Sequence, residues 1–132
     1  MTCSNPFNTT KFNTDLATLD SNLTRTILPQ LRAAMTVNGK VTGDLVLMDC
    51  YDPYQNACSN SVSYIQKINS HLTSDLGGSG LIVDVFTAFS GATTPNNTIC
   101  SYTWMCSVFK DFHATRKGYR VVASAFEGEM GY

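Results

Sequence analysis

Two short apolar runs that flank a helical pattern constrain the fold of this chain most strongly. The runs are DLVLMD at residues 44–49 and LIVDVF at residues 81–86, which are bounded by turn residues and rich in branched side chains, as buried strands are. Between them, residues 61–76 carry apolar side chains at helical spacing, and the glycine-rich residues 77–80 end that pattern. A strand, a helix and a strand within about forty residues have the length of a right-handed βαβ crossover. We therefore expect a parallel sheet that is covered on both faces.

A helix is expected on either side of this unit. Residues 14–35, with Thr14 or Asn13 as a cap, carry an apolar stripe at steps of three and four. Pro29 lacks a backbone donor, so we expect a kink there or a helix in two parts. A closing helix is expected from Ala114 onward, after an irregular stretch that is too long for an ordinary connection. The stripe of the first helix comprises Leu16, Leu19, Leu23, Ile27 and Leu31, and the inner face of the closing helix comprises Tyr119, Val122, Ala123 and Phe126.

The predicted elements indicate one α/β domain over residues 1–132 with an incomplete sheet. A chain of this length buries roughly two thirds of its unfolded surface, which is enough for a single core. Doubly wound sheets usually carry about five strands, whereas the pattern here indicates two, and the first helix has no preceding strand. We therefore expect strands to be missing before Met1. An edge strand within residues 1–12 is the alternative, although this segment alternates poorly and contains Pro6.

The charge balance argues against several classes of partner. Nine Lys plus Arg face ten Asp plus Glu, so the chain as a whole has no electrostatic footprint for nucleic acid or anionic lipid. No apolar run approaches the roughly eighteen residues of a membrane span. The opening MTCSNPFNTT also lacks the basic and apolar regions of a signal peptide. We expect neither a nucleic-acid partner nor an integral membrane segment.

The five cysteines bear on the cellular compartment. Cys100 and Cys106 enclose a short loop that a disulfide could close, whereas Cys3, Cys50 and Cys58 leave at least one thiol without an internal partner. Small cysteine-rich chains are typical of oxidising compartments, which favours this disulfide and a secreted, extracellular protein whose signal lies upstream. Five buried thiols in a cytosolic protein are the alternative. No cysteine pair has the C-x2-C form of a zinc site, so no metal is expected.

The stretch DFHATRKGY places an acid and an imidazole, Asp111 and His113, just before the closing helix. The loop that enters this helix returns to the edge where the carboxyl ends of the strands form a ligand crevice. An imidazole there can act as a general base near neutral pH, with a carboxylate that fixes its tautomer. The alternative role of Asp111 is that of a carboxylate stabilised by a helix N-terminus. The other histidine, His71, lies off its helical stripe and is expected to be solvated.

These segments resemble the secreted SGNH (GDSL-type) hydrolases. DFHATRKGYRVVASAF is similar to their closing block, and CYDPYQNAC, VDVFTAF and CSYTWMC are similar to middle segments of the bacterial members, in matching order over nearly the whole chain. The resemblance implies a three-layer αβα, flavodoxin-like fold and an esterase or lipase-like acylhydrolase that acts on a small-molecule or lipid ester without a cofactor. It further implies that His113 is the base of a serine hydrolase triad and Asp111 its partner. Only Phe112 separates them here, whereas the commoner family spacing has two residues.

The family's nucleophile is not found in this sequence. The family takes its serine from a GDS-type block after the first strand and oxyanion donors from a G-x-N-D block. Residues 43–45, Gly-Asp-Leu, imitate the first block by letters only, since position 45 is leucine and the segment opens a strand. The resemblance implies the C-terminal portion of a hydrolase that is inactive alone and has a missing N-terminal half as its partner. A non-catalytic secreted binding module on an SGNH-like scaffold is the alternative.

Aromatic residues follow both predicted strands and suit a substrate pocket. Tyr51, Tyr54 and Phe86 are expected to line a hydrophobic cleft for a fatty or aromatic acyl group. The alternative is packing beneath the disulfide-held loop, which is the expectation for Trp104. We expect the polar residues at the strands, Asp52 and Asp84, to satisfy backbone donors and not to bind a metal.

Overall fold

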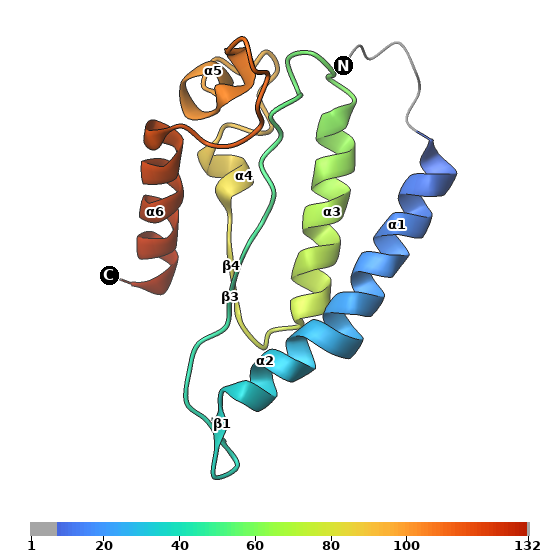
Figure 1. Ribbon diagram of the computed structural model, residues 1–132, viewed down its shortest axis with the longest axis vertical. Helices are drawn as coiled ribbons and strands as arrows, with labels where there is room; N and C mark the ends of the chain where they lie inside the picture. The colour runs from blue at the N-terminus through green and yellow to red at the C-terminus, as the bar shows by residue number, and fades with distance from the viewer. Residues whose placement is uncertain (1–7, 132) are drawn as a thin grey trace.

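A two-stranded parallel sheet lies at the centre of the structure, a computed structural model that describes residues 8–131 (Figure 1). Strand β3 (Val46–Met48) pairs with strand β4 (Leu81–Val83), and helix α3 (Ser61–Leu76) connects them. Gly77 ends α3 in the left-handed conformation, as the glycine-rich segment predicted. The strand, helix and strand expected from the sequence are confirmed, although both strands are shorter than the apolar runs.

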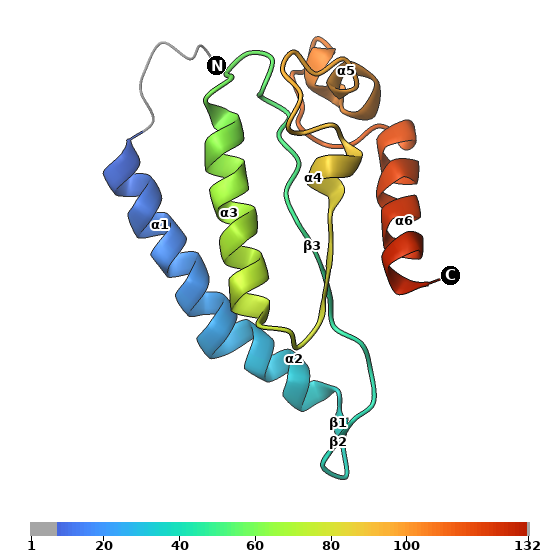
Figure 2. The same cartoon turned by 180° about the vertical axis from the view of Figure 1, so that it is seen from behind.

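Helices make up most of the remaining described chain. Figures 1 and 2 show α1 and α3 on one side of the strands and α6 on the other. The fold is therefore mixed α/β, as expected. In chain order the other elements are α1 (Thr9–Asn22), the π-helix η1 (Leu23–Ile27), α2 (Leu28–Ala34), β1 (Thr36–Val37), β2 (Lys40–Val41), α4 (Val85–Ala88), α5 (Ile99–Tyr102), the 3-10 helix η2 (Trp104–Cys106) and α6 (Arg116–Met130).

Alternate strand residues pack against the helices on the two sides of the sheet. In the parallel register Leu47 lies opposite Ile82, and Met48 lies opposite Val83. Leu47 and Ile82 pack against buried leucines of η1, α2 and α3, whereas Met48 and Val83 pack with Phe89 and with residues of α6. Because successive strand side chains point to opposite faces, the sheet separates two apolar cores.

Strand β4 ends before Phe86 because Asp84 begins a helix. The Asp84 carboxylate accepts a hydrogen bond from the Thr87 backbone N–H at 2.7 Å, which caps α4. Asp49, directly after β3, accepts hydrogen bonds from the backbone N–H groups of Val85 and Phe86. The expectation of a strand through Phe86 is therefore wrong, since these two carboxylates stabilise a helical turn in its last residues.

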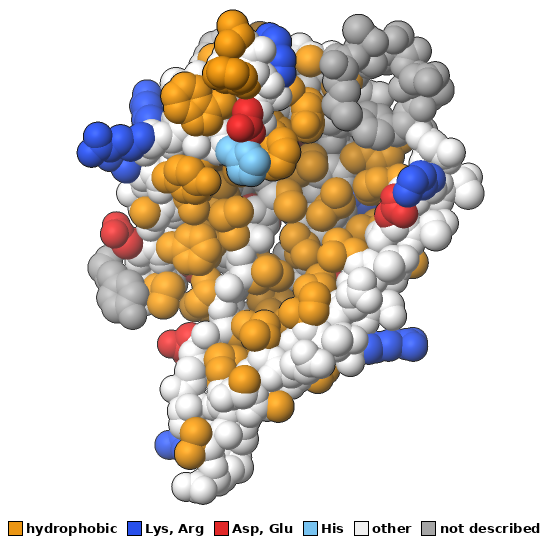
Figure 3. Space-filling model, in the orientation of Figure 1, with side chains coloured by type: hydrophobic (Ala, Val, Ile, Leu, Met, Phe, Trp, Pro, Cys, Tyr) orange, Lys and Arg blue, Asp and Glu red, His pale blue; other side chains and the backbone are white. Residues whose placement is uncertain are grey.

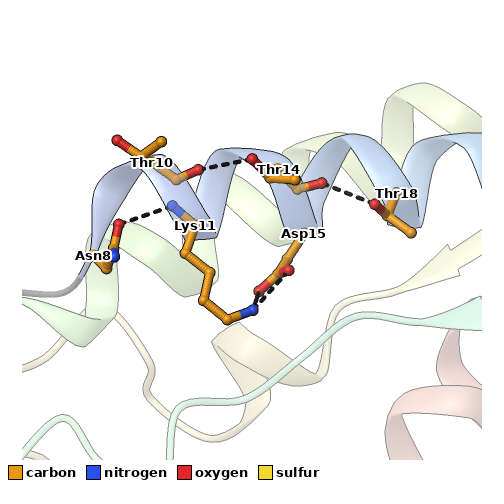
Figure 4. A network of polar contacts seen from close by, with 6 residues as sticks. All are labelled: Asn8, Thr10, Lys11, Thr14, Asp15 and Thr18. Carbon is orange, nitrogen blue, oxygen red and sulfur yellow. Dashed lines mark hydrogen bonds and ion pairs between the residues drawn. The ribbon is translucent and has the colours of Figure 1, made fainter.

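Helix α1 begins at Thr9, earlier than the apolar stripe indicated. Asn8 is the cap, and its side-chain oxygen accepts the Lys11 backbone N–H at 2.9 Å (Figure 4). Lys11 forms an ion pair with Asp15 one turn later at 2.6 Å. The Thr14 hydroxyl donates to a carbonyl oxygen one turn earlier, so Thr14 lies inside the helix and does not cap it. Polar contacts thus stabilise these first turns, which precede the apolar stripe that begins at Leu16.

The helix is interrupted near Pro29, as predicted, and the interruption changes the buried face. Pro29 lies in the first turn of α2, directly after the π-helical turn, and its nitrogen cannot donate a hydrogen bond to that turn. The π-helical turn before it inserts one residue, so the next buried leucine after Leu23 is Leu28. Ile27 and Leu31 are each 43% exposed. The expectation that both continue the buried stripe is therefore wrong.

A short hairpin, which was not among the predicted elements, follows α2. Strands β1 and β2 pair antiparallel, with Thr36 opposite Val41. Asn38 and Gly39 form its turn with φ values of 52° and 76°. An Asn-Gly pair is a strong hairpin signal because both central residues require positive φ.

The parallel sheet has two strands within residues 8–131, and neither has a second partner strand there. All three residues of β3 are only half-buried, and Leu81 of β4 is 39% exposed. The alternative edge strand is not formed by residues 9–12, which are helical, and residues 1–7 lie outside the described part. Among the described residues, each strand therefore presents one edge without a partner strand.

Helix α6 turns a slightly different face to the core than expected. Val122 and Phe126 pack there as predicted, but Tyr119 is 59% exposed and Ala123 is exposed as well. Residues three and four apart share one face of a helix, so the inward stripe passes beside Tyr119 and Ala123. Its other two members are Val121 and Ala125.

Candidate active site at the strand ends

The side chains of Asp111 and His113 contact each other directly. His113 Nδ1 lies 2.5 Å from Asp111 Oδ1. The same carboxylate oxygen accepts the backbone N–H of His113 at 2.9 Å. The Phe112 ring stacks on the imidazole, with the ring centroids 4.3 Å apart. A single intervening residue is therefore sufficient to bring the carboxylate and the imidazole together.

This contact determines which imidazole nitrogen is free. A carboxylate at Nδ1 accepts the Nδ1–H proton and so favours the neutral tautomer in which Nε2 carries a lone pair. The His113 side chain is 61% exposed, so a reacting group can reach the ring. The arrangement can accept a proton at Nε2 while the carboxylate stabilises the imidazolium that forms.

The charge on Asp111 is stabilised by hydrogen bonds from His113. The backbone N–H of His113, followed by its side chain, lowers the pKa of Asp111 below the ordinary aspartate value. Helix α6 begins at Arg116 with Thr115 as its cap, and no acidic residue lies in its first turn. The alternative role of Asp111, a carboxylate stabilised by this helix terminus, therefore does not apply.

A disulfide loop holds the backbone of His113 in position. The expected disulfide between Cys100 and Cys106 is present and links α5 to η2. The Trp104 N–H donates to the carbonyl oxygen of His113 at 3.0 Å. Thr103, which precedes Trp104, and Ala114, which follows His113, form an isolated antiparallel bridge. The position of the imidazole thus depends on the residues between the two cysteines.

The start of α6 fixes the segment after His113. The Thr115 side chain accepts the Gly118 N–H at 3.2 Å, and the Thr115 N–H donates to the Tyr102 carbonyl oxygen at 2.8 Å. Gly118 lies so close to Tyr102 that a Cβ atom would overlap that carbonyl oxygen. Glycine therefore permits the close approach between α6 and α5.

Tyr51 connects the histidine loop to the end of β3. Its hydroxyl donates to the Phe112 carbonyl oxygen at 2.9 Å, and its ring stacks on the buried Phe89 with centroids 4.4 Å apart. Burial, together with the nearby Tyr119 and Asp111, raises the pKa of Tyr51. Because Tyr51 follows β3, the loop lies at the carboxyl end of the parallel strands (Figure 1), where ligands bind in open α/β sheets.

Comparisons of the chain with protein-family models, with curated proteins and with solved structures find no match. Function is therefore inferred from the geometry of this site and from the motif resemblance. Within residues 8–131, no group of three or more His, Cys, Asp or Glu side chains is arranged to hold a metal ion. No helix in the same residues is long and apolar enough to cross a bilayer.

The three aromatic residues expected to line an acyl pocket lie in different surroundings. Tyr54 borders an open cavity of about 400 Å³, which Ile99, Met105 and Lys110 also line. Phe86 is buried, and its carbonyl oxygen accepts the N–H of a glycine five residues later. Tyr51 is engaged with the histidine loop. The cavity at Tyr54 does not include the other two residues, so the structure does not bring the three into one pocket.

The surroundings of Trp104 and His71 differ from those predicted from the sequence. Trp104, which was expected to pack beneath the loop, is 52% exposed, and its backbone N–H makes the hydrogen bond to His113. His71, which was expected to be solvated, has Nδ1 3.0 Å from both carboxylate oxygens of Asp20. This partner comes from α1, which packs against α3. The expectation for Trp104 is therefore wrong, whereas His71 is partly exposed, and its partner could not be predicted because Asp20 lies on another helix.

A buried carboxyl group at the end of β3, that of Asp49, was not among the residues predicted from the sequence. Asp49 is 6% exposed and accepts the N–H groups of Val85 at 2.7 Å and Phe86 at 2.9 Å. Burial, with the negative charge of Asp84, raises the pKa of Asp49 to about 6, although the two hydrogen bonds oppose this change. The available signal was the position of an acid directly after a buried apolar run.

The remaining polar residues at the strand ends support the backbone. Asp52 accepts the Tyr54 N–H at 2.9 Å and a hydrogen bond from the Ser61 hydroxyl, and Asp84 caps α4. The prediction that both aspartates satisfy backbone donors is confirmed. Among the described cysteines, Cys50 is free, and burial raises the pKa of its thiol, which makes it a poor nucleophile.

Proposed function

We propose that this chain supplies the general base and its carboxylate partner to a carboxylic ester hydrolase of the SGNH type. The observation that carries the proposal is the contact between Asp111 and His113 on a loop at the carboxyl ends of two parallel strands. The mixed α/β arrangement, with helices on both sides of the sheet, is compatible with the three-layer, flavodoxin-like fold of that family. The matched motifs and their order add support.

The chemistry is acyl transfer through a serine. The serine hydroxyl attacks the ester carbonyl, and Nε2 of His113 takes the hydroxyl proton as the carbon–oxygen bond forms. The protonated imidazole then donates this proton to the departing alcohol, which leaves an acyl-serine. Water repeats the sequence, with His113 again as the base, and releases the carboxylic acid. Asp111 holds the ring and stabilises its positive charge in both half-reactions.

The nucleophile in this proposal belongs to a GDS-type block that the 132 residues do not contain. The half-buried residues of β3 and the unpaired strand edges support the docking of further strands beside the sheet. Such strands would bring a serine and oxyanion donors to the edge that bears His113. Each absent oxyanion donor costs a factor of roughly 100 to 1,000 in rate, so this chain alone does not hydrolyse esters.

The proposed setting is extracellular, and the proposed substrate is a small-molecule or lipid ester. The disulfide between Cys100 and Cys106 supports this setting because such bonds persist in oxidising compartments. The exposed imidazole supports a substrate that approaches from solvent or from a surface. Acid–base chemistry of this kind uses no cofactor.

Fluorophosphonate labelling tests the proposal on the natural polypeptide that contains both these residues and a serine block. We expect labelling of the wild type, loss of labelling in His113→Ala and weaker labelling in Asp111→Asn. His71→Ala is the matched control, since it removes the chain's other histidine, which pairs with Asp20 away from the strand ends. A folded, serine-containing wild type that is not labelled would refute the hydrolase and favour the non-catalytic binding module.

A further inference from the structure

A tight turn beside His113 presents two apolar side chains to water. The Lys110 N–H donates to the Ser107 carbonyl oxygen at 3.2 Å, which makes Val108 and Phe109 the central residues of a β-turn. Val108 is 91% exposed and Phe109 is 83% exposed. Central turn positions usually carry Gly, Pro, Asn, Asp or Ser. An apolar pair at this place therefore indicates a contact surface.

Three further apolar side chains are exposed on either side of this turn. Trp104 is 52% exposed, Phe112 is 50% exposed and Tyr119 is 59% exposed. They come from η2, from the histidine loop and from the first turns of α6. Figure 3 shows hydrophobic side chains gathered at the end of the molecule formed by α5 and the loop to α6. We name this group the apolar rim, and it comprises Trp104, Val108, Phe109, Phe112 and Tyr119.

Basic side chains accompany the apolar rim. Residues 104–120 contain four basic residues and one acidic residue, although the whole chain has a net charge of −1. The acidic residue is Asp111, which is paired with His113. The basic residues are all exposed, and they are Lys110, Arg116, Lys117 and Arg120. The net charge of the whole chain therefore does not show the local excess of positive charge around the rim. This positive charge complements an anionic surface.

We propose that the apolar rim docks this protein on an anionic lipid bilayer. Val108 and Phe109 enter the headgroup region, and the basic side chains lie against the lipid phosphates. The Phe109 N–H donates to the Ser107 hydroxyl oxygen at 3.2 Å, so the turn is formed before docking and loses little conformational freedom. This inference goes beyond ester hydrolysis, because docking requires no serine. The docked end also bears His113.

Vesicle binding by the 132-residue chain tests the proposal. The chain has one tryptophan, Trp104, which lies in the rim and reports its transfer from water. With vesicles of phosphatidylcholine and phosphatidylserine, we expect co-sedimentation and a blue shift of the tryptophan emission. Added salt is expected to weaken this binding, and pure phosphatidylcholine vesicles are expected to bind less.

A pair of matched variants locates the contact. Val108→Ser combined with Phe109→Ser is expected to weaken vesicle binding by roughly a factor of ten or more. Val37→Ser combined with Val41→Ser is the control, since these valines are 56% and 55% exposed on the β1–β2 hairpin, away from the rim (Figure 1). The control is expected to bind as the wild type does. Circular dichroism establishes that both variants fold. If one of them does not fold, the shift of tryptophan emission in the wild-type chain still tests whether the rim enters the bilayer.

Four results would overturn the proposal. They are no binding to the mixed vesicles, equal binding to pure phosphatidylcholine, equal loss of binding in both variants, and a dimer that forms without lipid and is abolished by the changes at Val108 and Phe109. The last result would assign the rim to a second copy of the chain. None of these results bears on fluorophosphonate labelling, so failure of docking and failure of the hydrolase proposal are distinguishable.

Discussion

Replacement of Asp49 by asparagine is predicted to remove a pH dependence from the stability of the fold. The carboxyl is buried at the end of β3, and its pKa is raised from 3.8 to about 6. The folded state therefore retains the proton that the unfolded state loses at lower pH. Stability from this group is fully present below the unfolded pKa and is lost as pH rises through the folded pKa. Each pKa unit corresponds to about 1.4 kcal/mol, so the loss is at most about 3 kcal/mol.

Asparagine keeps the shape of this side chain and stays neutral. Its carbonyl oxygen can accept the same two N–H groups, from Val85 and Phe86. Urea unfolding followed by circular dichroism, at about pH 4 and about pH 7.5, measures the free energy of unfolding of both proteins. We expect the free energy of unfolding of the variant to rise relative to that of the wild type, by up to about 3 kcal/mol, between the lower and the higher pH. Asp44→Asn, at the exposed start of the same segment, is the control. A difference between Asp49→Asn and the wild type that is independent of pH would refute the reasoning.

Three further predictions concern the segment around the histidine loop. Gly118→Ala is expected to destabilise the fold by about 2 kcal/mol, because the added Cβ would overlap a backbone carbonyl oxygen. Gly128→Ala in the same helix meets no atom and is expected to stabilise the fold by about 0.5 to 1 kcal/mol. Thermal unfolding of both variants checks this contrast, and equal effects of the two substitutions would contradict it. Removal of the disulfide across residues 100–106 by Cys100→Ser combined with Cys106→Ser is expected to cost about 2 kcal/mol in unfolding free energy. Chemical denaturation of this variant and the wild type, both without reductant, would show no difference if the bond were unimportant. The pKa of Asp111, followed by carboxyl NMR, is expected to rise toward the ordinary aspartate value in His113→Ala, because the side-chain contribution that lowers it is removed; an unchanged pKa would count against the contact.

The elements that apolar periodicity marks were predictable from the sequence. The helix of residues 61–76, the parallel pairing of its flanking strands and the disulfide all follow from local patterns. Local polar contacts explain where the predictions failed. Asn8 and Lys11 extend α1 beyond its stripe, and Asp84 converts the end of a predicted strand into a helical turn.

The candidate site was predictable only in part. The short separation of Asp111 and His113 in the sequence indicated their contact, since one intervening residue leaves both side chains within reach of each other. The burial of Asp49 and the link from Tyr51 to the histidine loop depend on elements that meet only in the folded chain. The exposed turn at Val108 and Phe109 was not predicted, because the hydrophobic content and net charge of the whole chain do not show which side chains the fold exposes.

The tautomer of His113 tests the central claim most directly. Long-range proton–nitrogen NMR correlation on the neutral imidazole distinguishes Nδ1–H from Nε2–H. The 2.5 Å contact with Asp111 predicts Nδ1–H, with Nε2 free to accept a proton, and predicts a shift toward Nε2–H in Asp111→Ala. A wild-type imidazole that carries its proton on Nε2, and is unaffected by that substitution, would contradict the assignment of this histidine as the base.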